Sequence, residues 1–533
     1  MATLTFKGKP FVQNYHLTVP YHQLVPKKDK SLTDKVRLDD NLIVHGDNLK
    51  ALKALLPTYA GKVKCIYIDP PYNTGNEKWV YNDNVNSPMM QEWLGKVVDR
   101  EDLTRHDKWL CMMMPRLKIL RDLLSDDGLI FVSIGDDELA NLRFLMDEAF
   151  HEGRFVGLIT WKARVKPVNI GDAKYRPQRE TEYVLVYEKT ASQGKFRPLS
   201  TGGVRSYPHT FKGRKYRVAT ILKSNRGANR RETMCFELEG YTPPEGQRWQ
   251  AGEDVIRQLW RDEYIEFREG VPFRRYFEDE EGAEHDPFYC FMDVDWSGTS
   301  ESGKGELNEI LGSHHGFDTV KPSQLISTLI QSCVAPDRCD IVLDSFAGSG
   351  TTAQAVLALN KADGGNRRFI LVECEDYADK ITAERVSRVI KGVPQTSDET
   401  LKKGLGGTFS YFELGKSIEV DGILEGKDLP NYIDLARYIF YTATGQEFNE
   451  RKVDEKRHFI GSSEEHDVYL LYKPDIQFLK DTALTLERAR ALGPSKGKRR
   501  LVFAPTKYLD QEQLAELHID FAQLPFEIYR LAE

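Results

Sequence analysis

The four residues Asp69-Pro70-Pro71-Tyr72 directly follow an apolar run, Val63 to Ile68. Two consecutive prolines fix an extended turn and remove two backbone N–H donors, so backbone carbonyls stay free to accept hydrogen bonds. Asp69 adds a carboxylate acceptor and Tyr72 adds a flat ring. This set suits an exocyclic amino group on a planar base, which would donate both hydrogens and turn its nitrogen lone pair towards an electrophile. The plainer alternative is a structural Pro-Pro turn with a core tyrosine.

A glycine-rich turn follows another apolar run, Cys339 to Leu343. Within it, Gly348-Ser349-Gly350-Thr351-Thr352-Ala353 satisfies the loose pattern G-x-G-x-x-G/A. Glycines let a tight strand-to-helix turn approach a ligand, and the helix N-terminus offers free N–H groups. Glu373 ends the next apolar run, 23 residues after Gly350, where a carboxylate can accept hydrogen bonds from ribose hydroxyls. The pattern indicates a nucleoside-containing cofactor, although a plain Gly-rich connection is the alternative, and the lack of GK[ST] disfavours a P-loop.

Strands and helices must bring these two motifs together. We expect buried strands over Leu42 to His45, Val63 to Ile68, Gly128 to Ile134, Phe155 to Trp161, Tyr183 to Tyr187, Cys339 to Leu343 and Phe369 to Val372. We expect helices over Leu49 to Leu56, 105–124, 136–150, 323–334, the stretch ending at Leu359, and Tyr377 to Ile390. Pro115 is expected to start or kink the helix at 105–124. The alternation predicts an α/β fold, a doubly wound and mostly parallel sheet covered on both faces.

Changes in composition divide the chain into five parts. The predicted parts are an N-terminal arm at 1–35, a catalytic half-domain at 36–190, an inserted domain at 191–312, a cofactor half-domain at 313–395, and a small C-terminal α/β domain at 408–533. The insert has weak helical periodicity and frequent Gly, Pro, Arg and aromatic residues. The Gly-rich stretch from Lys403 to Gly407 forms the linker before the C-terminal domain.

The insert contains a basic segment with nine Lys/Arg, no acid and three interleaved aromatics. The basic residues are Arg205, Lys212, Arg214, Lys215, Arg217, Lys223, Arg226, Arg230 and Arg231. Without context, a charge run is more often a solvated face than a binding site. Beside an enzyme that acts on a nucleic-acid base, it becomes a candidate nucleic-acid interface.

Composition excludes several classes of protein. The chain has 533 residues, 40% of them apolar and 29% charged, and a net charge of −7, which is typical of a globular protein with a core. No apolar run approaches the ~18 residues of a membrane span, and the N-terminus has no signal-peptide pattern. Seven scattered cysteines without a CxxC pair indicate reduced thiols in a cytoplasmic protein. His314-His315 has no partner at metal-ligand spacing, so no metal is expected.

Taken together, Asp69 to Gly75 (DPPYNTG) and Asp344 to Thr352 (DSFAGSGTT) resemble the DNA amino-methyltransferases. In that family DPPY is the catalytic motif and FxGxG binds S-adenosylmethionine. The catalytic motif comes first here, which resembles the β class and, over the longer pattern, the modification subunits of type III restriction systems. Gly46 to Leu49 and Thr319 to Pro322 resemble accessory segments of the same family. Asp344-Ser345 departs from the usual Asp-Pro, which should change turn rigidity more than chemistry.

The resemblance implies a role for each matched residue. Asp69, Pro70, Pro71 and Tyr72 would be catalytic, with Tyr72 stacking on a target base flipped out of the duplex. The cofactor S-adenosylmethionine would be bound by Asp47, Lys321, Pro322, Asp344, Phe346, Gly348, Gly350, Thr351, Thr352 and Glu373. The insert would be a target-recognition domain whose basic residues contact phosphates of double-stranded DNA. A homodimer and a possible restriction (helicase–nuclease) subunit complete the implied partners.

The reaction that the resemblance implies is methyl transfer to the N6 amino group of adenine. Asp at the first position of DPPY favours adenine, since the cytosine enzymes of the family more often carry Ser there. An N4-cytosine methyltransferase remains the first alternative. An NAD-dependent oxidoreductase would explain the Gly-rich turn and Glu373 but not DPPY. A methyltransferase acting on RNA or protein, and a non-enzymatic DNA-binding subunit, are the remaining alternatives.

Overall fold

The computed structural model describes residues 4–74, 105–166, 175, 177–191, 196–197, 199–200, 206–226, 230–281, 285–286, 288–418, 429–492 and 497–524. Two compact units emerge: 1–197 with 289–533, and the inserted 198–288. The predicted insert, 191–312, is wider than this inserted unit. Helix α10 (Ser300–Leu311) packs against α13 (Glu384–Lys391), so it lies within the larger unit.

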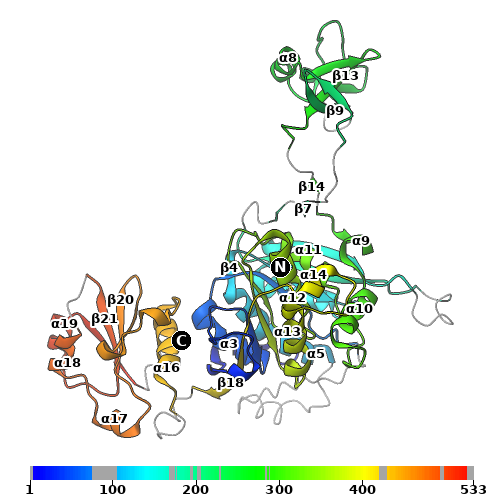
Figure 1. Ribbon diagram of the computed structural model, residues 1–533. Coiled ribbons are helices and arrows are strands. Elements are labelled where there is room, and N and C mark those ends of the chain that lie inside the picture. Colours follow the sequence, from blue (N-terminus) through cyan, green and yellow to red (C-terminus); the bar gives the residue numbers. More distant parts are fainter. Residues whose placement is uncertain are drawn as a thin grey trace. The chain divides into compact units, whose positions relative to one another are not determined.

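A ten-stranded mixed sheet forms the centre of the larger unit (Figure 1). In spatial order its strands are β1 (His22–Pro26), β18 (Ser410–Ser417), β2 (Leu42–His45), β17 (Arg368–Glu373), β16 (Ile341–Asp344), β3 (Val63–Ile68), β4 (Leu124–Ile134), β6 (Thr181–Glu188), β5 (Phe155–Lys162) and β15 (Phe291–Met292). Six of the strand pairs are parallel, and β1–β18, β4–β6 and β6–β5 are antiparallel. The α/β prediction of a mostly parallel sheet is therefore confirmed.

The order of the strands reverses at the centre of this sheet. From β3 the chain leads through α5 (Arg105–Leu123) to β4, and from β16 through α12 (Thr351–Asp363) to β17, on the opposite side. Because such crossovers are right-handed, the two helices cover opposite faces. Ligands of open α/β sheets bind outside the carboxyl ends of the strands at such a switch point. Both sequence motifs begin at this edge.

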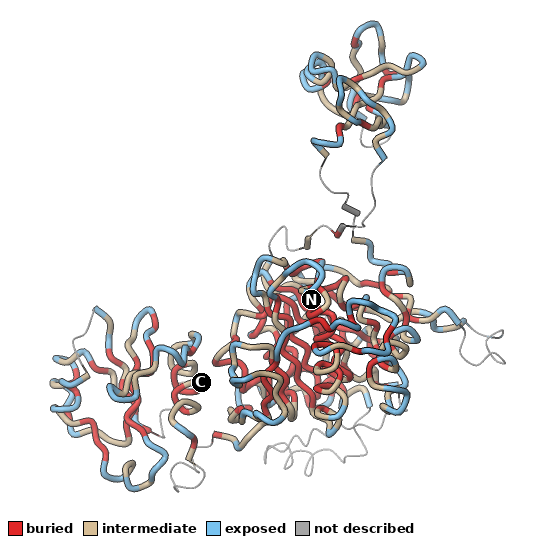
Figure 2. The backbone as a smooth tube through the Cα atoms, viewed as in Figure 1, coloured by how far each residue is buried: buried red, intermediate tan, exposed pale blue. Residues whose placement is uncertain are grey.

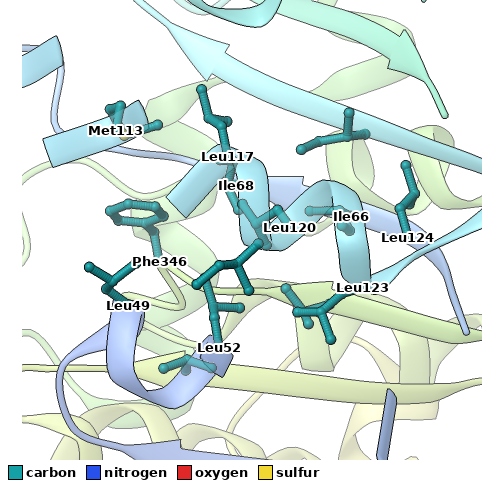
Figure 3. Close-up of a cluster of buried hydrophobic side chains, with 14 of the residues drawn as sticks. Leu49, Leu52, Ile66, Ile68, Met113, Leu117, Leu120, Leu123, Leu124 and Phe346 are labelled. Atoms are coloured by element: carbon teal, nitrogen blue, oxygen red, sulfur yellow. The ribbon is translucent and has the colours of Figure 1, made fainter. Parts of the chain in front are cut away.

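The face under α5 carries a large apolar core. Helices α3 (Asn48–Tyr59), α5 and α6 (Leu139–Phe150) contribute side chains such as Leu52, Leu117 and Leu120, all fully buried. These pack on Ile66 and Ile68 of β3, as Figure 3 shows. Buried residues follow the central strands in Figure 2. α5 runs through Pro115 without a break, so the proline does not start a helix there, and the nearby Met114 and Leu117 are fully buried in this core.

Residues 4–35, predicted as an arm, supply α1 (Lys9–Val12), α2 (Tyr15–Thr18) and the edge strand β1. At the other end, β18 belongs to the large sheet. A separate four-stranded sheet follows, made by β19 (Phe459–Ser462), β20 (His466–Leu470), β21 (Arg499–Ala504) and β22 (Ile519–Gln523) in that order. Its two apolar clusters lie on either side, one of them around α16 (Tyr432–Thr444).

The inserted unit is built from antiparallel strands (green in Figure 1). Its main sheet has the order β12 (Ile265–Arg268), β13 (Val271–Phe277), β9 (Arg214–Thr220) and β8 (His209–Phe211). Helix α8 (Glu253–Arg261) completes a small core with Trp249, Ile256 and Ile265. Leu199 and Ser200 pair with Asp286 and His285, so the chain enters and leaves this unit side by side. No helix among the residues described is long and apolar enough to cross a membrane.

Candidate active site

The loop Asp69 to Tyr72 leaves the carboxyl end of β3 and is held by two helices. Trp109 of α5 donates its indole N–H to the Pro71 carbonyl at 2.7 Å, so protein already occupies that acceptor. Asn73 ends the loop in the left-handed region, with φ of 59°, which asparagine tolerates better than most residues. Its side-chain amide donates to Glu138, the N-cap residue of α6. The loop therefore has a fixed backbone.

A lysine lies against the carboxylate of this loop. Lys321 Nζ donates to both oxygens of Asp69, at 2.9 and 2.7 Å. The same ammonium is 3.4 Å from Glu182 Oε2 and 5.0 Å from the centroid of the Tyr72 ring. Only 13% of the Lys321 side chain is exposed, and the two carboxylates raise its pKa against the opposing effect of burial. The residue is therefore a buried cation shared between two carboxylates.

Tyr72 packs closely on the end of β4. A β-carbon at Gly135 would lie 2.9 Å from Tyr72 Cδ2, so only glycine leaves room for the ring. The Tyr72 hydroxyl donates to Glu182 Oε2 at 2.9 Å. Burial, together with the negative charges of Asp69 and Glu182, raises the pKa of Tyr72 well above its usual range. The phenol therefore stays protonated and acts as a donor.

Asp344 organises the glycine-rich turn after β16. Its Oδ1 accepts the Phe346 N–H at 3.0 Å and its Oδ2 accepts the Thr352 hydroxyl at 2.6 Å. Gly348 and Gly350 both have positive φ, 52° and 82°, which suits glycine. Gly350 is the N-cap of α12 and makes no side-chain cap, so the first N–H groups of this 13-residue helix face the turn.

Glu373 ends β17 with its carboxylate against the same turn. Its Oε2 accepts the Gly348 N–H at 2.7 Å, and its Oε1 accepts the N–H groups of Cys374 and Glu375 at 2.9 and 3.1 Å. Only 1% of the residue is exposed. Burial raises the pKa of Glu373 to about 7 and likewise that of Asp344 to about 7. Two carboxyl groups that titrate near neutrality thus lie under one turn.

A buried arginine supports the turn from below. Arg385 of α13 is fully buried and donates to the Ser349 and Thr351 hydroxyls, both at 2.8 Å. Burial lowers its pKa to about 10, so the guanidinium remains charged at neutral pH. The Thr382 hydroxyl donates to the Gly348 carbonyl at 2.6 Å. Each of these side chains lies at least 34 residues further along the chain than the residue it contacts in the turn.

The two accessory segments, Gly46 to Leu49 and Thr319 to Pro322, lie next to the two motifs. Asp47 caps α3 by accepting the Lys50 N–H at 3.0 Å, and its Oδ2 is 3.6 Å from the buried guanidinium of Arg116. Asn48 donates to the Ser345 carbonyl at 3.1 Å, which joins this segment to the glycine-rich turn. Pro322 is the N-cap residue of α11 (Ser323–Gln331).

Sequence reasoning found the motifs but missed their supporting residues. Lys321, predicted on the cofactor side, contacts Asp69, which was predicted to be catalytic. Glu182 and Arg385 were not singled out, and they contact Tyr72 and the glycine-rich turn respectively. The signal for Glu182 is its place at the start of β6: this strand is antiparallel to β4, so its first residues lie where β4 ends. Lys78, Trp79 and Tyr81 follow the Asp69 to Tyr72 loop in sequence and are candidates to line the path of an extruded base, but they lie outside the described residues.

Eight of the nine predicted basic residues of the insert fall into two groups. Four form ion pairs within the insert: Lys212 with Glu263, Arg214 with Asp279 and Glu280, Arg217 with Glu281, and Arg230 with Glu232. Four are solvent-exposed and form no ion pair with a described residue: Lys215, Lys223, Arg226 and Arg231. Arg205 lies outside the described part of the chain. The second group has charge available for phosphates.

Comparison with known proteins decides the family. Residues 63–384, which span both motifs and the insert, match the family described as DNA methylase. The chain belongs to the DNA methylase family. This match covers more than half of the chain, and individual relatives align over a longer part of it. The type III restriction-modification enzyme StyLTI Mod subunit of Salmonella typhimurium strain LT2 is 33% identical over 83% of this chain and 70% of its own length.

Two further relatives of this DNA methylase belong to different types of restriction-modification enzyme. The type III EcoPI Mod subunit of Escherichia phage P1 is 28% identical over 75% of this chain and 70% of its own length. The type II methyltransferase M.KpnI of Klebsiella pneumoniae is 30% identical over 62% of this chain and 79% of its own length. Among solved structures, the PvuII cytosine-N4-specific DNA methyltransferase covers 65% of this chain and 86% of its own at 14% identity, with a TM-score of 0.34, a likeness too slight to bear on function. The predicted DNA methyltransferase activity is confirmed at the level of the family.

Proposed function

We propose that this DNA methylase transfers a methyl group from S-adenosylmethionine to the N6 amino group of adenine in double-stranded DNA. One observation carries the proposal. Asp69 and the glycine-rich turn leave neighbouring strands, β3 and β16, which pair through Leu343 and Ile66 at the switch point of the sheet. A cofactor on the turn and a base on Asp69 would therefore meet at one edge.

The cofactor half of the site fits a nucleoside carrying an amino acid. Glu373 uses three backbone N–H groups, which leaves acceptor capacity on its carboxylate for ribose hydroxyls. The uncapped N-terminus of α12 offers N–H groups to a carboxylate. We place Asp47, Lys321, Pro322, Asp344, Phe346, Gly348, Gly350, Thr351, Thr352 and Glu373 around this ligand. When bound, S-adenosylmethionine supplies an electrophilic methyl group.

The catalytic half holds the target amine. Asp69 and the Pro70 carbonyl accept its two hydrogens, while the Pro71 carbonyl is already bonded to Trp109. An adenine inside a duplex cannot reach these groups, so it is flipped out and rests on Tyr72. The exocyclic nitrogen is itself the nucleophile, and the protein contributes positioning and electrostatic stabilisation. An N4-cytosine reaction would use the same groups, and Asp rather than Ser at position 69 favours adenine.

The insert and the relatives point to the partners. Free basic residues of the inserted unit, such as Lys215 and Lys223, would contact DNA phosphates and give salt-dependent affinity. Because its relatives include type III Mod subunits, we place this chain in a restriction-modification system, with a restriction subunit as a possible partner. A homodimer is part of the same proposal.

Nucleoside mass spectrometry tests the reaction directly. Unmethylated DNA is incubated with purified protein and S-adenosylmethionine, then digested to nucleosides. N6-methyladenine is the expected product, and sequencing of the methylated DNA locates the recognition site. N4-methylcytosine would contradict the choice of base but keep the site. No methylated nucleoside, from protein shown to bind the cofactor and DNA, would overturn the proposal.

A further inference from the structure

Glu182 occupies a position at the active edge that neither motif supplies. It is the second residue of β6, which pairs antiparallel with both β4 and β5. The registers Ile134 with Tyr183 and Trp161 with Glu182 place it where β4 and β5 end. Only 16% of its side chain is exposed. Because β6 runs antiparallel to its neighbours, its first residues place a buried carboxylate beside the catalytic loop.

Both contacts of Glu182 are with site residues. Its Oε2 accepts the Tyr72 hydroxyl at 2.9 Å and lies 3.4 Å from Lys321 Nζ. Lys321 in turn donates to both oxygens of Asp69. One positive charge therefore lies between two negative charges, and Trp161, 5.8 Å from Nζ, covers it with its ring. Burial of these groups makes their mutual attraction stronger than it would be in water.

This arrangement creates a competition at Asp69. A target amine that donates to Asp69 must share oxygens with which Lys321 is already bonded. An ammonium leaving those oxygens needs another acceptor, because a buried unpaired charge is costly. Glu182 Oε2 is that acceptor, since it is already within 3.4 Å of Nζ. A small rotation of the lysine side chain would exchange one carboxylate for the other.

We propose that Glu182 is a positioning residue of the methyl-transfer site, which takes the Lys321 ammonium from Asp69 when the target amine binds and anchors Tyr72 through its hydroxyl. This inference rests on the proposed function. Without the charge of Glu182, Lys321 is bound by Asp69 alone and keeps the amine out. Of the residues placed around the cofactor, Lys321 contacts Glu182. The others lie on other segments, so cofactor binding should change little.

Two substitutions separate the charge from the hydrogen bond. Glu182→Gln keeps the shape and an oxygen that accepts from Tyr72, but it removes the charge. Glu182→Asp keeps the charge on a shorter side chain. Glu180→Gln is the matched control, because Glu180 is exposed and lies two residues away. Each variant is checked for its melting temperature and for S-adenosylmethionine binding, so that a loss of fold is distinguished from a loss of function.

The assay is single-turnover methylation of a duplex bearing the mapped recognition site. For Glu182→Gln we expect the rate to fall about tenfold or more, with cofactor and DNA affinities within about twofold of wild type. Glu182→Asp should lose less, and Glu180→Gln nothing. With 2-aminopurine beside a target adenine that keeps its N6 amino group, the fluorescence rise on base flipping should be smaller for Glu182→Gln at saturating DNA, an effect that a purely structural role would not produce.

The outcomes separate this inference from the function on which it rests. A wild-type rate for Glu182→Gln, or a rate for Glu182→Asp below that of Glu182→Gln, would overturn the charge-exchange role. If Glu182→Gln does not fold, Glu182→Asp decides the matter. A Glu182→Asp protein as inactive as an Asp69 variant would then overturn the charge-exchange role. Wild-type protein that methylates no adenine in the same assay would instead overturn the proposed function.

Discussion

At the scale of single residues, Asp69 has the most specific proposed role, which is to accept a hydrogen bond from the target amine. Asp69→Asn keeps the size of the side chain but removes the charge that pairs with Lys321 and would polarise the target amine. We expect the methylation rate to fall about 10²–10³-fold, as for removal of one preorganised electrostatic contact. S-adenosylmethionine binding, measured by calorimetry, should persist because, apart from Lys321, the residues placed around the cofactor are not bonded to Asp69.

Asp126→Asn is a suitable control for this substitution, since its side chain is 84% exposed on the amino-terminal half of β4. It should methylate at the wild-type rate. Asp69→Asn protein with wild-type activity would show that the negative charge at position 69 has no part in the reaction.

Asp344 and Glu373 make stability depend on pH near neutrality. Burial raises the pKa of each to about 7, above the ~4 of unfolded carboxyl groups. Between these values the folded protein holds protons that the unfolded chain releases, so stability falls as pH rises from about 4 to about 7. Asp344→Asn removes one of the two groups, and an amide can still accept from Phe346 and meet the Thr352 hydroxyl.

The cofactor-free Asp344→Asn variant should therefore lose less of its melting temperature than wild type between about pH 5.5 and about pH 8. The measurement is thermal unfolding at several pH values in one buffer series. Equal pH dependence in wild type and variant would show that Asp344 is ionised throughout this range in the folded protein. Glu373 remains in both proteins and sets the residual slope.

Residues that directly follow a strand were predictable, and residues that support them were not. Asp69 and Glu373 lie at strand ends that hydrophobic runs mark, so their roles could be proposed from local sequence. The contact between Lys321 and Asp69 joins residues 252 positions apart, and that between Tyr72 and Glu182 joins residues 110 apart. Such pairings depend on which strands become neighbours, which periodicity does not specify.

At the scale of elements, α10 controls where Lys321 lies. A β-carbon at Gly303 would come within 2.3 Å of the Val320 carbonyl oxygen and 2.8 Å of the Pro322 nitrogen. The helix therefore presses directly on the backbone that carries Lys321. In addition, Glu306 of α10 accepts the Ser323 N–H at 3.2 Å and lies 3.9 Å from Arg385, which supports the glycine-rich turn.

Gly303→Ala should therefore impair catalysis from outside the site. The methyl group must displace segment 320–322, and with it the Lys321 ammonium, so we expect the methylation rate to fall about tenfold or more. Gly305→Ala on the same helix is the matched control, because its β-carbon would meet nothing within 4 Å. That control should keep full activity and gain up to about 1 kcal/mol of stability. Equal behaviour of the two variants in rate assays would refute the coupling.

The elements themselves were largely predictable from periodicity. β2 and β3 begin and end at the expected residues, and β16 is displaced by only one or two. The pairing of β1 with β18 was not predicted, because it joins the two ends of a long stretch of sequence. The expectation that Pro115 starts a new helix was wrong: proline often interrupts a helix, but α5 continues through it.

At the scale of the whole molecule, the insert is not a basic domain. Residues 198–288 contain 15 Lys/Arg and 16 Asp/Glu, so the acid-free run at 205–231 is offset by the acids that follow. Four of the basic residues predicted to contact DNA form ion pairs with these acids within the insert. Any attraction to DNA must therefore come from local groups that keep their charge, rather than from the net charge of the unit.

This distinction predicts which substitutions change the salt dependence of DNA binding. Lys215 and Lys223 are exposed and form no ion pair with a described residue, whereas Lys212 lies against Glu263 and Arg230 against Glu232. For each of Lys215→Gln and Lys223→Gln, the slope of log K against log salt should become shallower by about 0.9 where one phosphate contact is lost. Lys212→Gln and Arg230→Gln should leave the slope unchanged within error.

The slope is measured from DNA affinities, determined by fluorescence anisotropy between about 50 and 200 mM salt. The opposite result, in which Lys212→Gln and Arg230→Gln make the slope shallower, would contradict this prediction. It would mean that the ion pairs with Glu263 and Glu232 open when DNA binds, and that these acids compete with the phosphates.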